Sequence, residues 1–272
     1  MYITLNSHIL LLITAKLIRT FYSKRQTSLP LFKMEKEIKY PIGINKYLAY
    51  KKICSRREAD KLVLQKKVKI NGRIAIPIDK VLENDNVIVE PPDGGFKKLV
   101  YLAFNKPQGV ITHSPQKGEP QIKDILNFDK EVFPLGRLDK DSSGLIILTN
   151  DGRVTDKLLN PKYHHEKEYI VKTSKPIDNL FLKKMSGGLR LEDGYITKKC
   201  EVEKISKDRF SIVLTEGKKH QIRRMCALLG YEISDLERRR IMNIKLNSLM
   251  PGDFREIKGK ELSDFLKSLD LN

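Results

Sequence analysis

The chain has 272 residues, of which 40% are hydrophobic and 32% are charged, a composition typical of a globular protein with room for about two domains. Its 52 lysines and arginines outnumber its 34 aspartates and glutamates, leaving a net charge of +18. Such an excess favours a polyanionic partner, because neutralised phosphates release counterions. A membrane surface is a less favoured partner, since the charge is not confined to one amphipathic helix. A high lysine content can also simply reflect the amino-acid composition common to the proteins of one genome.

The cysteines and histidines lack the spacing of a metal site. Cys54, Cys200 and Cys226 are odd in number and far apart, which favours reduced thiols over a disulfide framework. No histidine belongs to an H-E-x-x-H or similar ligand pattern. We therefore expect no metal ion, and a reducing compartment that we take to be the cytoplasm.

Residues 1–42 form an N-terminal extension. Its first 33 residues contain no Asp or Glu, and an apolar run, Ile9–Ala15, is followed by basic residues. The run is too short to span a bilayer, and a secretory signal would place its positive charge ahead of the apolar stretch. Organellar targeting is one interpretation. We favour a disordered extension, or a start assigned upstream of Met34.

Residues 43–90 are predicted to form a small basic domain that begins with two helices. The first helix is expected over Ile44–Lys52. Ser55 and Glu58 have the spacing of a capping box, which opens a second helix that ends near Lys66.

Strands are predicted in the rest of this domain. Val68–Ile70 is followed by Asn71-Gly72, a strong hairpin signal, and Val81–Val89 supplies one or two more strands. Residues 46–73 hold ten basic and two acidic residues, a local charge of 10 − 2 = +8. The order of elements and the charge resemble an S4 RNA-binding domain, whose basic candidates here are Lys46, Arg56, Arg57 and Lys69. The alternative is a solvated basic helix pair that binds nothing.

A linker over residues 91–98, containing Pro91-Pro92-Asp93-Gly94-Gly95, precedes a second domain over residues 99–272. Its expected strands are Val100–Asn105, Leu145–Thr149, Tyr169–Thr173, Lys199–Ile205 and Phe210–Thr215. Its expected helices are Asp151–Leu159, Asp178–Met185, Lys218–Leu229 and residues 260–269, and Lys106-Pro107-Gln108-Gly109 is expected to start a loop. Strands and helices do not alternate strictly, which predicts an α+β domain on a mixed, largely antiparallel sheet.

Three short motifs in this domain carry residues that could do chemistry. Gly136-Arg137-Leu138-Asp139 places a carboxylate beside a guanidinium, although an aspartate often serves only to start a turn. A calcium loop fits Asp139 and Asp141, but asparagine stands where the bidentate glutamate is required. Tyr169 could be ordinary sheet packing, and Arg223 could belong to a merely solvated helix face.

The motifs together resemble the RsuA/RluB/RluE/RluF family of pseudouridine synthases over about residues 43–267. Gly136–Asp139, Lys167-Glu168-Tyr169 and His220-Gln221-Ile222-Arg223-Arg224-Met225 occur in the family's order, with an S4-like module in front. Lys140-Asp141-Ser142 and the run Leu236–Asn243 are similar to the RluF branch. Residues 1–33 lie outside the resemblance.

The resemblance implies a role for each motif. Asp139 would be the catalytic carboxylate, acting as a nucleophile or by removing a sugar proton. Tyr169 would stack on the uracil and serve as a base at C5, while Arg223 would pair with Asp139. Arg137 would hold or replace the flipped nucleotide, and Arg224 would contribute to RNA binding.

The implied function is the isomerisation of specific uridines to pseudouridine in RNA, without a cofactor. The implied substrate is large-subunit (23S) ribosomal RNA, with transfer RNA as a second, and we expect a monomer that binds no membrane. The first alternative is a non-catalytic RNA-binding ribosome assembly factor on the same fold. An S4-type translation or stress factor is the second, against which the long motif-bearing domain argues.

Overall fold

A computed structural model describes residues 38–92, 95, 98–114, 116 and 118–271. The chain divides into two units, Met1–Tyr40 and Pro41–Asn272, and the second holds all the helices and strands that the structure describes. Expectations for the N-terminal extension fall almost entirely outside the described residues. Among those residues, no helix has the length and apolar character to cross a membrane.

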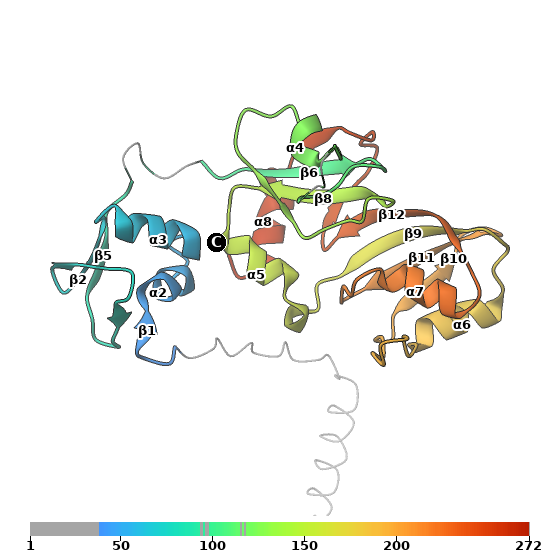
Figure 1. Cartoon of the computed structure of the whole chain (residues 1–272), viewed down its shortest axis with the longest axis horizontal. Helices are drawn as coiled ribbons and strands as arrows, with labels where there is room; N and C mark the ends of the chain where they lie inside the picture. Colours follow the sequence, from blue (N-terminus) through green and yellow to red (C-terminus); the bar gives the residue numbers. More distant parts are fainter. Residues whose placement is uncertain (1–37, 93–94, 96–97, 115, 117, 272) are drawn as a thin grey trace, which may run out of the picture. The chain divides into compact units, whose positions relative to one another are not determined.

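The basic module contains two helices and five short strands (Figure 1). The predicted capping box is present: the Glu58 amide donates to Ser55 Oγ, and the Ser55 amide donates to the Glu58 carboxylate. Asn71 and Gly72 have φ values of 49° and 83° and connect two antiparallel strands, as the hairpin signal predicted. The elements are β1 (Ile42–Gly43), α2 (Ile44–Tyr50), α3 (Arg56–Leu64), β2 (Val68–Ile70), β3 (Arg73–Ile74), β4 (Lys80–Val81) and β5 (Val87–Val89).

The second domain is built on a sheet with the order β10-β11-β9-β12-β8-β6-β14, to which β13 and β7 add at β12 and β8. Every pairing of this sheet among the described residues is antiparallel except that of β12 with β8. The predicted mixed, largely antiparallel α+β sheet is confirmed. Its strands are β6 (Tyr101–Lys106), β7 (Phe133–Leu135), β8 (Ser143–Thr149), β9 (Lys167–Thr173), β10 (Glu201–Lys204), β11 (Arg209–Leu214), β12 (Ile233–Ile241), β13 (Ile244–Lys245) and β14 (Phe254–Glu256).

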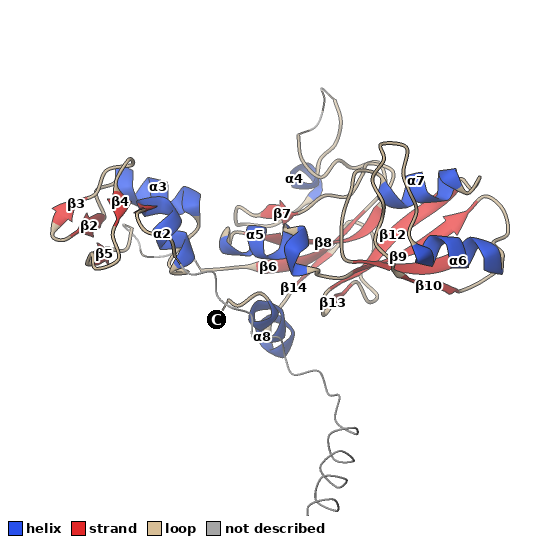
Figure 2. Cartoon of the chain, turned by 90° about the horizontal axis from the view of Figure 1, so that it is seen from below, coloured by secondary structure: helices blue, strands red, loops and turns tan. Residues whose placement is uncertain are grey.

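Helices pack on both faces of this sheet (Figure 2). They are α4 (Ile122–Ile125), α5 (Arg153–Leu159), η1 (Pro161–Tyr163), α6 (Asn179–Gly187), α7 (Gln221–Leu228) and α8 (Gly259–Ser268). All the strands and helices predicted for this domain are present, with ends shifted by up to three residues.

The sequence prediction did not include the strands β7, β12, β13 and β14 or the helices α4 and η1, and it placed Lys106 in a loop. β12 lies in the middle of the sheet, yet its charged sequence predicted no strand. Its charges are tolerated because they are paired: Arg240 bonds Glu168 at 2.7 Å and Glu166 at 2.9 Å, and Arg239 bonds Glu237 at 3.2 Å. Lys106 is the last residue of β6, not the start of a loop, and it is fully buried.

Successive side chains along a strand point to opposite faces of the sheet, and in the second domain the buried side chains form three clusters. On β6 and β8, Tyr101 and Ile147 face α5 and α8, whereas Phe104 and Ile146 face α4. A third cluster joins α6 and α7 to β9, β11 and β12, with Phe181 and Met225 among its buried members. The sheet is therefore buried on both faces at β6 and β8, and α6 and α7 pack together beside β12.

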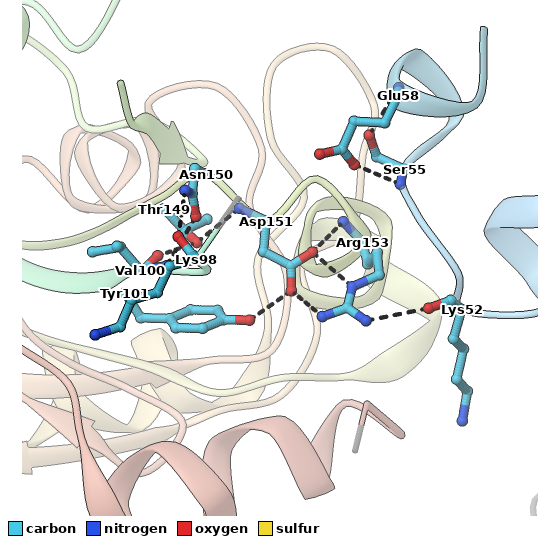
Figure 3. Close-up of polar contacts among 10 residues, drawn as sticks. All are labelled: Lys52, Ser55, Glu58, Lys98, Val100, Tyr101, Thr149, Asn150, Asp151 and Arg153. Carbon is cyan, nitrogen blue, oxygen red and sulfur yellow. Dashed lines mark hydrogen bonds and ion pairs between the residues drawn. The ribbon is translucent and has the colours of Figure 1, made fainter. Parts of the chain in front are cut away.

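A buried polar network holds the end of β8 (Figure 3). Asp151, which is 2% exposed, accepts hydrogen bonds from the Tyr101 hydroxyl at 2.5 Å and from Arg153 Nε and Nη2, both at 2.8 Å. Burial acts to raise the pKa of Asp151, but these partners together hold it below its ordinary value. Arg153 also donates to the main-chain oxygen of Lys52, at 3.2 Å.

Candidate active site

The turn that carries Asp139 is fixed at its neighbours. Gly136 has φ +81°, a conformation that favours glycine and starts the turn. The Leu138 amide donates to Thr112 Oγ1 at 3.1 Å, and that hydroxyl donates back to the Leu138 carbonyl at 2.8 Å. On the other side of Asp139, the Gly109 amide donates to the Lys140 carbonyl at 2.9 Å.

Lys106 lies beneath this turn. Its ammonium donates to the main-chain oxygens of Val110 at 2.7 Å, Pro107 at 2.9 Å and Lys140 at 3.5 Å. Burial lowers the pKa of Lys106 to about 8, although the negative charges of Asp139 and Asp141 act in the opposite direction. A buried cation therefore joins the end of β6 to the turn that carries Asp139.

Arg223 contacts the turn from α7. Its Nη2 donates to the Asp141 carbonyl at 2.9 Å and reaches Ser142 Oγ at 3.4 Å. The pair between Arg223 and the Asp139 carboxylate, which the family resemblance implied, is not formed in this structure. Its Nη2 is bound instead to the main chain two residues beyond Asp139.

The Asp139 carboxylate instead faces His220. The distance from His220 Nε2 to Asp139 Oδ1 is 3.5 Å, and the two side chains are 48% and 38% exposed. This is the one ion pair or hydrogen bond that the Asp139 side chain makes among the described residues. The carboxylate is thus accessible from solvent and has an imidazole beside it.

Arg238 connects the turn to the sheet and is 3% exposed. Its Nε donates to the Leu145 carbonyl at 2.7 Å and its Nη1 to the Arg137 carbonyl at 3.4 Å. Arg238 is paired across the sheet with Gly144 on one side and Tyr169 on the other. Tyr169 therefore lies on β9, which is separated from β8 by β12. It is at the same level of the sheet as Gly144, five residues after Asp139.

The predicted RNA-binding residues fall into two groups. Lys46, Arg56, Arg57 and Arg137 are exposed. Lys69 and Arg224, in contrast, are engaged with carboxylates: Lys69 bonds Glu90 at 2.8 Å, and Arg224 bonds Glu192 at 2.5 Å and Asp193 at 2.8 Å.

Sequence reasoning assigned no role to Lys106, His220 or Arg238. Lys106 gave no signal, because nothing local distinguishes a buried cation from the many exposed ones in this chain. His220 and Arg238 both stand in runs that carry the resemblance, so their positions were signals. No three His, Cys, Asp or Glu side chains among the described residues are grouped to hold a metal ion.

Comparisons with known proteins agree with this architecture. Residues 42–87 match the S4 domain model, and residues 100–228 match the model described as RNA pseudouridylate synthase. The chain is 42% identical over 232 residues to the dual-specificity RNA pseudouridine synthase RluF of Salmonella typhi, covering 84% of this chain and 79% of the relative.

Two further similarities are more distant. The chain is 33% identical over 228 residues to the ribosomal large subunit pseudouridine synthase B of Bacillus subtilis, covering 80% of this chain and 93% of the relative. A crystal structure of a pseudouridylate synthase superposes with a TM-score of 0.61 and 27% identity, covering 84% of this chain and 99% of the other. The chain therefore belongs to the pseudouridine synthase family, as an RNA pseudouridine synthase that carries an S4 domain ahead of its catalytic domain.

Proposed function

We propose that Asp139 is the catalytic carboxylate of uridine isomerisation in this enzyme. The observation that carries this assignment is the construction of its turn. The neighbours of Asp139 are bonded to the rest of the domain: residue 137 to Arg238, residues 138 and 140 to the loop after β6, and residues 141 and 142 to Arg223. The Asp139 carboxylate is partly exposed to solvent beside His220. Rigid neighbours around a reactive, accessible acid are what a positioned catalytic group requires.

The reaction needs an ionised acid and no electron carrier. The N1–C1′ bond of uridine breaks, a C5–C1′ bond forms, the proton on C5 leaves and N1 ends protonated. The carboxylate can attack the sugar or the uracil ring, or it can remove a sugar proton, and every route begins from its charged form. Lys106 interacts electrostatically with Asp139, and His220 Nε2 lies 3.5 Å from its carboxylate, so both groups stand close to the charge that the reaction requires.

Tyr169 and Arg137 are assigned to the target nucleotide. A base must leave its stack before it can react, at a cost of about a few kcal/mol. Stacking on an aromatic ring offsets part of this by roughly 1–3 kcal/mol, a role we give to Tyr169 together with that of base at C5. Arg137, exposed two residues before Asp139, would hold or replace the flipped nucleotide.

For the substrate, we propose large-subunit ribosomal RNA, with transfer RNA as a second. Support comes from two relatives, one named as a dual-specificity enzyme and the other as a ribosomal large subunit enzyme. The exposed cations Lys46, Arg56 and Arg57 lie on the S4 domain and would bind the RNA backbone, with Lys69 and Arg224 as weaker contributors. We propose that the enzyme acts as a cytoplasmic monomer without a cofactor.

The test compares Asp139→Asn with Asp141→Asn, the next acid on the same turn. Large-subunit RNA labelled with tritium at C5 of uridine is incubated with each variant, and RNA affinity is measured separately. Loss of tritium release with Asp139→Asn alone, at unchanged affinity, supports the assignment. No release by the wild type from ribosomal RNA, from ribosomal particles or from transfer RNA would instead favour a non-catalytic assembly factor.

A further inference from the structure

The Asp139 carboxylate and the His220 imidazole form a pair between two separate elements. Their closest atoms, Oδ1 and Nε2, are 3.5 Å apart, longer than a hydrogen bond but close enough for an ion pair when the imidazole is protonated. Asp139 belongs to the turn before β8, and His220 is the residue before α7. The sequence distance between them is large, so the pair depends on how α7 is anchored.

A buried network anchors the start of α7. Gln221 and Glu216 are each 4% exposed. The Gln221 side chain donates to Glu216 Oε1 at 2.6 Å and accepts from the Lys218 amide at 3.1 Å. The Tyr195 hydroxyl donates to Glu216 Oε2, also at 2.6 Å. The residue that follows His220 is therefore immobilised by bonds of its own side chain.

The backbone of His220 adopts a conformation that few residues other than glycine accept. Its φ is 52° and its ψ is 28°, in the left-handed region. Histidine is among the residues more often found there, but the conformation still costs energy and persists only where the surroundings impose it. Here it directs the chain from the Glu216 network into α7, and the imidazole lies on the side of Asp139.

The other charged groups around the pair are engaged elsewhere. Arg223, one turn further along α7, bonds the Asp141 carbonyl and Ser142 Oγ. Lys106 bonds three main-chain oxygens below the turn, and Arg238 bonds two others. Charged neighbours in the sequence are the exposed Arg137, Asp141, Lys218 and Lys219, and Lys140, which bonds Glu119 at 2.9 Å. Among the described residues, His220 is the partner that the Asp139 carboxylate has within ion-pair distance, and it supplies a positive charge when protonated.

We propose that protonated His220 is a positioning residue for uridine isomerisation, which orients the Asp139 carboxylate and favours its ionised form. This inference rests on the proposed function of Asp139. The pair is half-exposed in the free protein, where solvent weakens it. Bound RNA would exclude that water and strengthen the attraction, since charges interact more strongly at low dielectric. Arg223 then fixes the turn, and His220 fixes the acid.

The test uses the full chain and substitutes His220→Asn. Asparagine also tolerates the left-handed region, so the backbone is retained while the charge and the reach are lost. The matched control is His164→Asn, which changes a second exposed histidine with a left-handed backbone, φ 54°, away from the turn. Asp139→Asn marks complete loss of the acid.

The rate of tritium release is measured in single turnovers at saturating RNA, from about pH 5.5 to about pH 9, a range that spans histidine's ordinary titration. The wild-type rate should fall toward the alkaline end of this range, where a histidine is neutral. His220→Asn should lower the maximal rate by on the order of 10-fold to 100-fold and remove the falling limb, with RNA affinity unchanged.

Two results would overturn this role. One is a His220→Asn enzyme with the rate and pH profile of the wild type and of His164→Asn, while Asp139→Asn is inactive. The other is a loss by the same factor at every pH, which would indicate a merely structural histidine. A wild-type protein that releases no tritium would overturn the proposed function itself, and the inference with it.

Discussion

Gly144 lies directly against the main chain of Arg238, where β8 and β12 pair in parallel register. A Cβ on Gly144 would come within 2.7 Å of the Arg238 amide nitrogen and closer still to its carbonyl oxygen, and φ at Gly144 is +103°. This short pairing joins the two halves of the sheet, β6 with β8 and β9 with β12. Asp139 lies five residues before Gly144, and the glycine sets how closely the two halves approach.

Gly144→Ala should therefore destabilise the protein by at least about 2 kcal/mol, because neither backbone can yield without breaking sheet bonds. Urea unfolding gives the free energy. The control is Gly187→Ala at the end of α6, where a Cβ meets nothing within 4 Å; alanine there should be neutral or stabilising by up to about 1 kcal/mol. Equal effects of the two substitutions would contradict the close contact.

Asp151→Asn should be strongly destabilising, because it leaves the partly buried Arg153 without its anion. We expect a loss of about 3–5 kcal/mol in the free energy of unfolding, against about 1 kcal/mol for Tyr101→Phe, which removes one hydrogen bond. The pKa of Asp151 is lowered in the folded state, so its contribution is present above its ordinary range. The difference between wild type and Asp151→Asn should shrink as the pH falls through that lowered pKa. A constant difference down to acid unfolding would argue against a charged Asp151.

Lys106 should make stability depend on pH in the alkaline range. Its pKa is lowered to about 8 when folded, so the unfolded chain binds more protons above that pH. The free energy of unfolding of wild type relative to Lys106→Met should therefore rise by about 2 kcal/mol between about pH 7 and about pH 9.5. Lys140→Met, an exposed lysine of the same turn, controls for the removal of a charge. Identical pH trends for both variants would contradict a buried ammonium.

Arg56 and Arg57 should dominate RNA binding by the S4 domain. Both are exposed, and neither side chain forms an ion pair or hydrogen bond among the described residues. Both stand in the first turn of α3, where the helix dipole disfavours cations. Arg56→Gln with Arg57→Gln should weaken binding about 10-fold or more at moderate salt and reduce the salt dependence, since fewer counterions are released. Lys69→Gln, whose lysine already pairs with Glu90, should change affinity less. Filter binding over a salt series measures both quantities.

Much of this protein could be predicted from local sequence. Ser55 and Glu58 predict the start of α3, and Asn71-Gly72 predicts its hairpin. Alternation along Tyr169–Thr173 predicts β9. These predictions succeed because caps, turns and strand faces depend on residues close in sequence. The order of the three motifs led to the family and to Asp139 for the same reason: each motif is a short contiguous run.

What only the tertiary structure decided are the contacts between distant segments. Lys106 is buried because main-chain oxygens of two loops converge on its ammonium, and β12 is central because β9 supplies carboxylates for its arginines. The partner of Asp139 is His220 and not Arg223, since the anchoring of α7 through Glu216 and Gln221 sets which side chain reaches the carboxylate. Such pairings depend on the packing of whole elements, whose free energy is spread over many residues and leaves no local pattern.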